Sequence, residues 1–337
     1  MKRIFSISLA VLAAVCLFRA SQFLNTAHAQ TGQRGHGVSQ HRINADGADS
    51  TDSDSSDAAP ETNPYGRVGA SLTTGGTGTV TPAITYHGGA LIQTPTIYII
   101  WYGNWNQSNG SDNAAGQQII RDWGHSIGGS PYYNLNTTYS AGGYTITGNV
   151  NWGGETTDTG SQGTRLTDAK VFSVVTNAIN TSKLPYDASG VYFVVSSSNV
   201  SESSGFCTYY CGWHTAGNNT NGARIRYSFV GNANRCLNAC AAQTTSPNSN
   251  AGVDGSISVM THELEEATTD PDPFSGWVDS NNSENGDKCA WTFGHFQYQV
   301  ANGSWANIHL GTRDYLIQRD LQQNVSGDLC MMDSTHN

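Results

Sequence analysis

The sequence has 337 residues, a net charge of −10 and only 12% charged residues. This length suits one large domain or two small ones, and either can bury a sizeable core. The acidic balance and the lack of a Lys/Arg cluster argue against a nucleic-acid partner, because contacts to phosphate need clustered positive charge.

The first 29 residues have the three parts of a secretory signal peptide. Lys2 and Arg3 precede a largely apolar run over residues 4–18, and Ala27 and Ala29 form an Ala-x-Ala cleavage pattern. We therefore expect cleavage after Ala29 and a secreted protein that is extracellular, periplasmic or held in a cell wall. No later stretch approaches about 20 apolar residues, so no membrane association is expected after cleavage.

Residues 30–80 are rich in Gly, Ser, Thr, Asp and Ala and hold few large apolar side chains. Such a segment buries too little apolar surface to offset the entropy lost on ordering. We predict a disordered, low-complexity leader here, followed by a folded domain over residues 81–334.

Strand-like and helix-like segments alternate along this domain. The former are rich in β-branched and aromatic residues, and the latter place apolar residues at helical spacing. In chain order we expect a strand at 95–102, a helix at 114–127, one or two strands at 132–147 with a turn at Gly142-Gly143, a helix from a Thr167 cap to about residue 180, a strand at 190–196 and a half-exposed strand at 224–230. This order predicts an α+β (or α/β) single domain.

A longer helix is predicted within residues 251–273, AGVDGSISVMTHELEEATTDPDP. Asp254 or Ser256 can cap its start, and Pro271 disfavours helical geometry at Asp270 and so ends it. One face carries an apolar stripe that would be buried against the rest of the domain: Ile257, Met260, Leu264 and Ala267.

The opposite face of this helix carries a set of residues typical of metal ligands. His262 and Glu266 are four residues apart and so share a face, with Glu263 beside them. The zincin pattern is H-E-x-x-H, and here a Glu replaces the second His, which zinc accepts as a ligand. We interpret His262 and Glu266 as zinc ligands and Glu263 as a general base. Short H-E-x-x-E strings also occur by chance on solvated acidic helix faces.

A third ligand is expected from beyond the helix, because catalytic zinc normally has three protein ligands. Glu284 and Asp287 in the segment GWVDSNNSENGDKC are candidates, and Asp270 competes with them. His214 and Trp277 are candidates for lining the site or contacting a substrate. If the ligands are oxygen atoms alone, Ca²⁺ is the alternative ion.

Six cysteines remain after removal of the signal peptide: Cys207, Cys211, Cys236, Cys240, Cys289 and Cys330. In an oxidising compartment, three disulfides are the default interpretation, and the sequence leaves their pairing open. The alternative is a zinc site made by the first four thiolates, whose spacing allows it.

Five segments, in order, resemble the EXORDIUM, or phosphate-induced protein, family of secreted proteins. They are TPAITYHGG, TIYIIWYGNW, YCGWH, GVDGSISVMTHELEEATTDP and GWVDSNNSENGDKC, and the likeness extends from about residue 81 to 330. The resemblance implies an extracellular protein linked, in plants, to growth and cell expansion. The resemblance also implies that His262, Glu263 and Glu266 correspond to the helix motif of the family.

Two functions are compatible with these observations. The first is a secreted zinc-dependent hydrolase of the peptidase type, with a zincin-like central sheet, an active-site helix and a disulfide-stabilised C-terminal part. An extended peptide would pair with an edge strand such as 224–230. The alternative is a non-catalytic extracellular or cell-wall binding or signalling protein linked to growth, with a structural metal or none.

Overall fold

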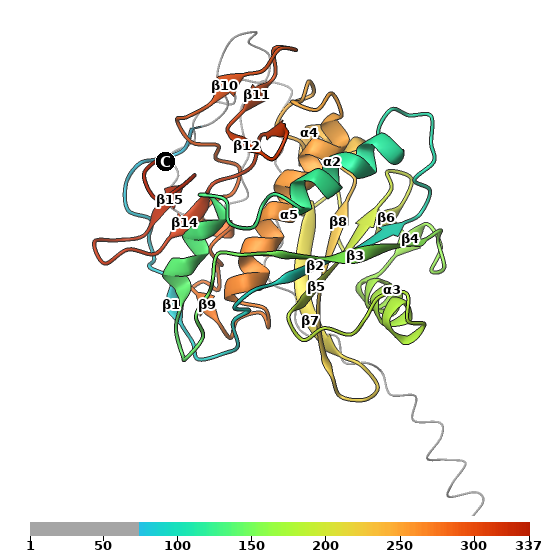
Figure 1. Cartoon of the computed structure of the whole chain (residues 1–337), viewed down its shortest axis with the longest axis horizontal. Coiled ribbons are helices and arrows are strands. Elements are labelled where there is room, and N and C mark those ends of the chain that lie inside the picture. Colours follow the sequence, from blue (N-terminus) through green and yellow to red (C-terminus); the bar gives the residue numbers. More distant parts are fainter. Residues whose placement is uncertain (1–73) are drawn as a thin grey trace, which may run out of the picture.

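A five-stranded mixed sheet lies at the centre of the fold, with strand order β3-β2-β5-β8-β7 (Figure 1). The computed structural model describes residues 74–337, so the predicted signal peptide and most of the predicted leader lie outside the described residues. Four strands are parallel, and β7 pairs antiparallel with β8 at one end. The strands are β2 (Thr96–Tyr102), β3 (Asn151–Asp158), β5 (Gly190–Ser196), β7 (Gly212–Asn218) and β8 (Arg224–Gly231).

Helices cover both faces of this sheet. Helix α2 (Ala114–Gly124) follows β2, and α3 (Asp168–Asn180) follows β3. The connection from β2 to β3 and the connection from β3 to β5 run in opposite directions across the sheet, so right-handed crossovers place the two helices on opposite faces. Ring contacts agree, since Arg121 of α2 lies over Trp101, whereas Phe172 of α3 packs on Tyr227 of β8.

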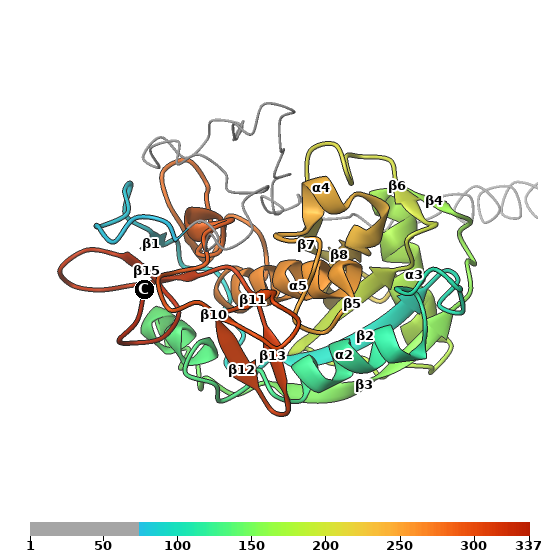
Figure 2. The ribbon, with the colours of Figure 1, turned by 90° about the horizontal axis from the view of Figure 1, so that it is seen from above.

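Helix α5 (Ala251–Thr269) packs on the same face as α2 and is buried along its whole length. Figure 2 shows α5 near the middle of the molecule, between α2 and α4 (Leu237–Cys240). The predicted apolar stripe is buried, and the helix ends before Pro271, as expected. The predicted cap residues, Asp254 or Ser256, lie four and six residues beyond the actual cap. The helix is capped by Asn250, whose side chain accepts a hydrogen bond from the Val253 amide.

The opposite, polar face of α5 is also buried, which the sequence pattern did not indicate. The helix contacts β7 and β8 of the sheet, the short helix η2 (Ala233–Arg235), and η1 (Tyr133–Tyr139). Its acidic side chains therefore lie inside the protein and are not a solvated surface.

Two predictions about the sheet were wrong. The segment 132–147, predicted as strands, forms the 3₁₀ helix η1 and an irregular stretch. Its Ser and Thr hydroxyls hydrogen-bond to nearby backbone groups, as Thr138 does with the Leu135 carbonyl, and such local bonds compete with strand pairing. Strand β8, predicted as a half-exposed edge, lies between β5 and β7, so it cannot pair with a peptide.

The C-terminal part consists of short paired strands, some of which pack around a second, smaller core, while others extend the main core. Strand β1 pairs with β9, β10 with β11, β12 with β13, and β14 with β15, while β4 pairs with β6 beside the main sheet. These elements are β1 (Thr85–Tyr86), β4 (Arg165–Leu166), β6 (Ser201–Glu202), β9 (Trp277–Val278), η3 (Asp287–Cys289), β10 (Tyr298–Gln299), β11 (Trp305–Ala306), β12 (Ile308–Leu310), β13 (Arg313–Tyr315), β14 (Asp320–Gln322) and β15 (Leu329–Met331).

Three disulfides join the six cysteines of the folded part: Cys207–Cys236, Cys211–Cys240 and Cys289–Cys330. This confirms the predicted number of disulfides and excludes the four-thiolate zinc alternative, because all four of those sulfurs are oxidised. One of the three closes the C-terminal part, while the other two fix the segment after β6 to the short helices before α5. No helix within residues 74–337 has the length and apolar character needed to span a bilayer.

Candidate metal centre

Helix α5 places its predicted ligands toward two elements that are distant in sequence. His262, Glu263 and Glu266 are all at least 98% buried. They meet His214 from β7 and the loop that leads into η3, which carries Glu284 and Asp287. The structure thus brings together six of the residues singled out in the sequence.

The first group of possible ligands is formed by His262, Glu266 and Asp287, whose donor atoms all lie within 4.8 Å of one another. His262 Nε2 is 2.7 Å from Glu266 Oε1 and 3.7 Å from Asp287 Oδ1. Neither ring nitrogen of His262 makes a hydrogen bond, although the ring is buried. The 2.7 Å between His262 Nε2 and Glu266 Oε1 is shorter than the roughly 3.4 Å between two ligands of one tetrahedral ion, so these side chains would have to separate slightly around a bound cation.

The loop before η3 is shaped to close over this group. Asp287 Oδ2 accepts a hydrogen bond from the Glu284 amide, and the Asp287 amide donates to Glu266 Oε1. Gly286 lies directly over the site, where an added Cβ would be 3.0 Å from Glu266 Oε1 and from two ring carbons of His262. The disulfide Cys289–Cys330 anchors the end of the loop.

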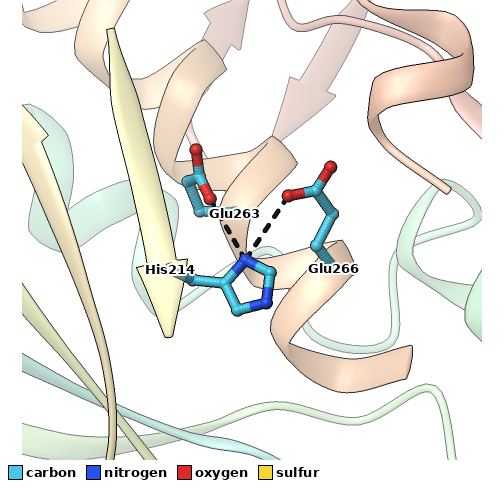
Figure 3. A group of neighbouring side chains, drawn as sticks. All are labelled: His214, Glu263 and Glu266. Atoms are coloured by element: carbon cyan, nitrogen blue, oxygen red, sulfur yellow. Dashed lines mark hydrogen bonds and ion pairs between the residues drawn. The ribbon is translucent and has the colours of Figure 1, made fainter. Parts of the chain in front are cut away.

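Strand alternation directs His214 toward α5. His214 lies opposite Ser228 in the β7–β8 register, whereas its neighbour Trp213 packs on the other face with Phe229. His214 Nδ1 is 3.3 Å from Glu263 Oε2 and 3.4 Å from Glu266 Oε2 (Figure 3). These three residues form a second group with donor atoms within 4.8 Å of one another.

The other ring nitrogen of His214 faces backbone and a further acid. Nε2 lies 3.2 Å from the carbonyl oxygen of Asp270 and 3.4 Å from Glu284 Oε1. Both carboxylate oxygens of Glu284 are buried without a hydrogen-bond partner. Glu284 therefore lies on the far side of the imidazole from Glu263 and Glu266.

Burial and mutual repulsion disturb the protonation of these groups. Burial raises the pKa of Glu263 to about 7, with repulsion from Glu266 adding to the rise and the hydrogen bond to His214 opposing it. For Glu266 the effect of burial is outweighed by the charges and close contacts of the His262 and His214 imidazoles, so its pKa falls to about 2. Burial and the charge of Glu266 raise the pKa of Glu284 well above its usual range.

His214 has the opposite balance. Burial alone would lower its pKa, but hydrogen bonds to Glu263 and Glu266 and the charges of these carboxylates raise it to about 10. In the metal-free chain the centre therefore retains protons on its imidazoles and on part of its acids. A cation would have to displace these protons to bind.

Asp270 and Trp277 occupy structural positions beside the centre. The Asp270 carboxylate accepts hydrogen bonds from the amides of Phe274, Ser275 and Gly276, so it stabilises the turn after α5. The Trp277 indole donates to the Tyr139 carbonyl and packs in the smaller core. Neither belongs to the two groups of donor atoms described above.

A polar network that sequence reasoning missed adjoins α5. Glu265 accepts a hydrogen bond from the Asn136 amide, and Asn285 donates to Asn136 and to Asp320. Glu265 and Asp320 are fully buried, and burial raises the pKa of Asp320 to about 7. Glu265 lies in the acidic run of the helix, but nothing in the sequence around Asp320 distinguishes it from a surface residue.

The centre is closed to solvent except at one residue. The side chain of Asp287 is 14% exposed, whereas those of His214, His262, Glu263 and Glu266 are at most 1% exposed. Any molecule that reaches the centre must therefore enter past the loop that carries Asp287.

Both groups of donor atoms lie within the segment that matches a family model. Residues 84–310 match the family model described as the phosphate-induced protein 1 conserved region. The chain is 30% identical to Protein EXORDIUM-like 3 of Arabidopsis thaliana in an alignment of 275 residues. This alignment covers 70% of this chain and 79% of that protein. It is 28% identical to Protein EXORDIUM-like 5 of the same plant over 244 residues, covering 63% of this chain and 65% of that protein. No solved structure matches.

Proposed function

The chain belongs to the phosphate-induced protein 1 family, as its motifs indicated, and from this premise we propose that it is a secreted, metal-dependent hydrolase of the peptidase type. The family membership does not supply an activity, so the proposal depends on the centre around α5. Three disulfides fit a protein that works in an oxidising, extracellular compartment.

The convergence of His262, Glu266 and Asp287 is the observation that carries the proposal. Their donors are one imidazole nitrogen and two carboxylate oxygens, a set that suits Zn²⁺ better than Ca²⁺, which takes oxygen ligands. Three protein ligands leave one position for water or substrate, as in catalytic zinc sites. When bound, the ion would supply a polarised, more acidic water molecule.

Glu263 is the residue placed to move a proton beside this group. Its pKa of about 7 in the metal-free chain suits a base that works near neutral pH. Its carboxylate lies 3.3 Å from His214 Nδ1, so the imidazole holds it in one orientation. In this role Glu263 would accept a proton from the attacking water and return it to the leaving group.

The topology supports the zincin-like arrangement expected from the sequence. Helix α5 follows the last parallel strand of the sheet and packs beside the antiparallel strand β7. In this arrangement β7, and not the interior strand β8, is the terminal strand next to the centre. A peptide would approach along the same side of the sheet as the loop that carries Asp287.

Burial favours a second candidate, a non-catalytic extracellular protein whose metal is structural. Closed metal sites stabilise folds, whereas catalytic sites keep an open position. The low exposure of every side chain but Asp287 fits the closed type. Under this candidate the protein would act by binding a cell-wall component or another protein.

Glu263→Gln separates the two candidates. We expect the variant to retain metal at His262, Glu266 and Asp287 and to lose at least 100-fold in cleavage of a fluorescence-quenched peptide library. Glu155→Gln, on the edge strand β3 and far from α5 in the sheet order, is the matched control. Stoichiometric metal without peptide cleavage by the wild type would favour the structural role, and absence of metal would refute both.

A further inference from the structure

We propose that the centre holds two metal ions bridged by Glu266, one in each of the two groups of donor atoms. The inference rests on the proposed metal site and adds a second one, made by His214, Glu263 and Glu266. Two-metal centres of hydrolases hold their ions about 3.5–4 Å apart and use both to activate a water molecule.

The two oxygens of Glu266 face different imidazoles. Oε1 lies 2.7 Å from His262 Nε2, and Oε2 lies 3.4 Å from His214 Nδ1. Glu266 Oε2 is buried and makes no hydrogen bond. A carboxylate that presents each oxygen to a separate histidine is arranged as a bridge.

The distances in the second group match those between ligands of one ion. Around a tetrahedral ion with bonds of 2.0–2.1 Å, neighbouring ligand atoms lie about 3.4 Å apart. His214 Nδ1 lies 3.3 Å from Glu263 Oε2 and 3.4 Å from Glu266 Oε2 (Figure 3). Both carboxylate oxygens therefore already lie at the distance from Nδ1 that a shared ion requires.

The partner of the other His214 nitrogen explains why Nδ1 is suited to be a ligand. Nε2 lies 3.2 Å from the carbonyl oxygen of Asp270, which can only accept, so Nε2 carries the hydrogen. In the neutral ring, Nδ1 then offers its lone pair toward Glu263 and Glu266. Ligand histidines are commonly fixed in this way, by donation of their second ring N–H to a backbone carbonyl.

The charge of the centre, when all its carboxylates are ionised, also matches two ions. Four carboxylates lie within 4 Å of the two imidazoles: Glu263, Glu266, Glu284 and Asp287. When ionised they carry four negative charges, and the two imidazoles can supply at most two positive ones. Two divalent ions with neutral imidazoles balance the four carboxylates, whereas one ion leaves two charges buried and uncompensated.

In the two-ion centre Glu263 is a ligand of the second ion, which replaces the role of base given to it beside a single ion. Glu263→Gln should therefore lower the metal content by one ion per chain and leave the ion at His262 in place. If Glu263 acts only as a base beside a single ion, the same variant leaves the metal content unchanged.

Zinc per chain, measured by elemental analysis after loading and desalting of the full secreted chain, tests the inference. We expect two ions in the wild type, one in His214→Ala, one in His262→Ala and none in Glu266→Ala. His309→Ala, whose side chain is 60% exposed on β12, is the control and should keep two. Folding of each variant is checked by circular dichroism and by the absence of free thiols.

The outcomes separate this inference from the proposed function. One ion in the wild type, lost in His262→Ala and kept in His214→Ala, overturns the two-ion centre but leaves the proposed metal site. One ion that is lost in His214→Ala and kept in His262→Ala overturns both, because it places the metal in the second group alone. No ion in the wild type also overturns both.

A measurement on the wild type covers the case in which the histidine variants do not fold. Co²⁺ is added stepwise to the metal-free protein, and its paramagnetic resonance signal is followed. Two ions joined by a carboxylate couple magnetically, so the signal should rise to one equivalent and fall toward the second. A signal that grows steadily to a single equivalent and then stops would overturn the two-ion centre.

Discussion

The stability of the metal-free chain is expected to fall as the pH rises from 5 to 8. Three buried groups hold protons that the unfolded chain releases. The pKa of Glu263 is raised from 4.5 to about 7, that of Asp320 from 3.8 to about 7, and that of His214 from 6.5 to about 10. Because the folded chain binds more protons than the unfolded chain between these values, rising pH favours unfolding.

The expected size follows from linkage. Each such group lowers the free energy of unfolding by about 1.4 kcal/mol per pH unit between its unfolded and folded pKa values. Glu263 and Asp320 act up to about pH 7, and His214 acts above pH 6.5. Glu266, with its lowered pKa, is ionised in both states above pH 5 and does not oppose the trend. The total loss from these three groups between pH 5 and 8 is on the order of 7 kcal/mol.

Chemical denaturation at pH 5, 6, 7 and 8, with chelator present and the disulfides intact, measures this loss. Saturating Zn²⁺ should remove most of it, because a bound ion holds the carboxylates ionised in the folded state. Glu263→Gln cannot ionise at this position and should reduce the slope by about 1.4 kcal/mol per pH unit between pH 5 and 7. A metal-free chain that is equally stable, or more stable, at pH 8 would refute the reasoning.

Three further changes test the surroundings of the centre. Gly286→Ala should weaken zinc affinity at least 10-fold by pushing on the His262 ring, and unchanged affinity in a zinc titration would show that the loop does not close there. Removal of the Cys289–Cys330 disulfide, which closes a loop of 41 residues, should lower the free energy of unfolding by about 4 kcal/mol in urea titrations, and a loss below about 1 kcal/mol would contradict this. Trp277→Phe should cost about 1 kcal/mol, from the lost indole hydrogen bond, and leave zinc content unchanged; zinc loss would instead place the indole at the metal.

The sequence correctly predicted those elements whose structure depends mainly on their own residues. The runs that form β2 and β5 are apolar throughout, and both are buried strands. Pro271 ends α5 at the expected place, because its ring restricts the residue before it whatever the tertiary surroundings. The spacing of His262 and Glu266 likewise placed both side chains on one helix face.

The remaining features depend on contacts between distant segments. The segment 132–147 resembles a strand in composition, but it pairs with no strand, and its first part packs on α5 as η1. The position of β8 inside the sheet follows from the strand order, which its own alternation does not encode. His214 reaches the centre only because β7 lies antiparallel to β8, and Asp320 only because β14 packs beside η1 and η3.

Anomalous diffraction from crystals of the zinc-loaded chain, recorded at the zinc absorption edge, tests the central claim most directly. We expect a peak at bonding distance, about 2.0–2.2 Å, from His262 Nε2, Glu266 Oε1 and Asp287 Oδ1. A zinc-loaded crystal without a peak at these three atoms would contradict the assignment of this centre as a metal site.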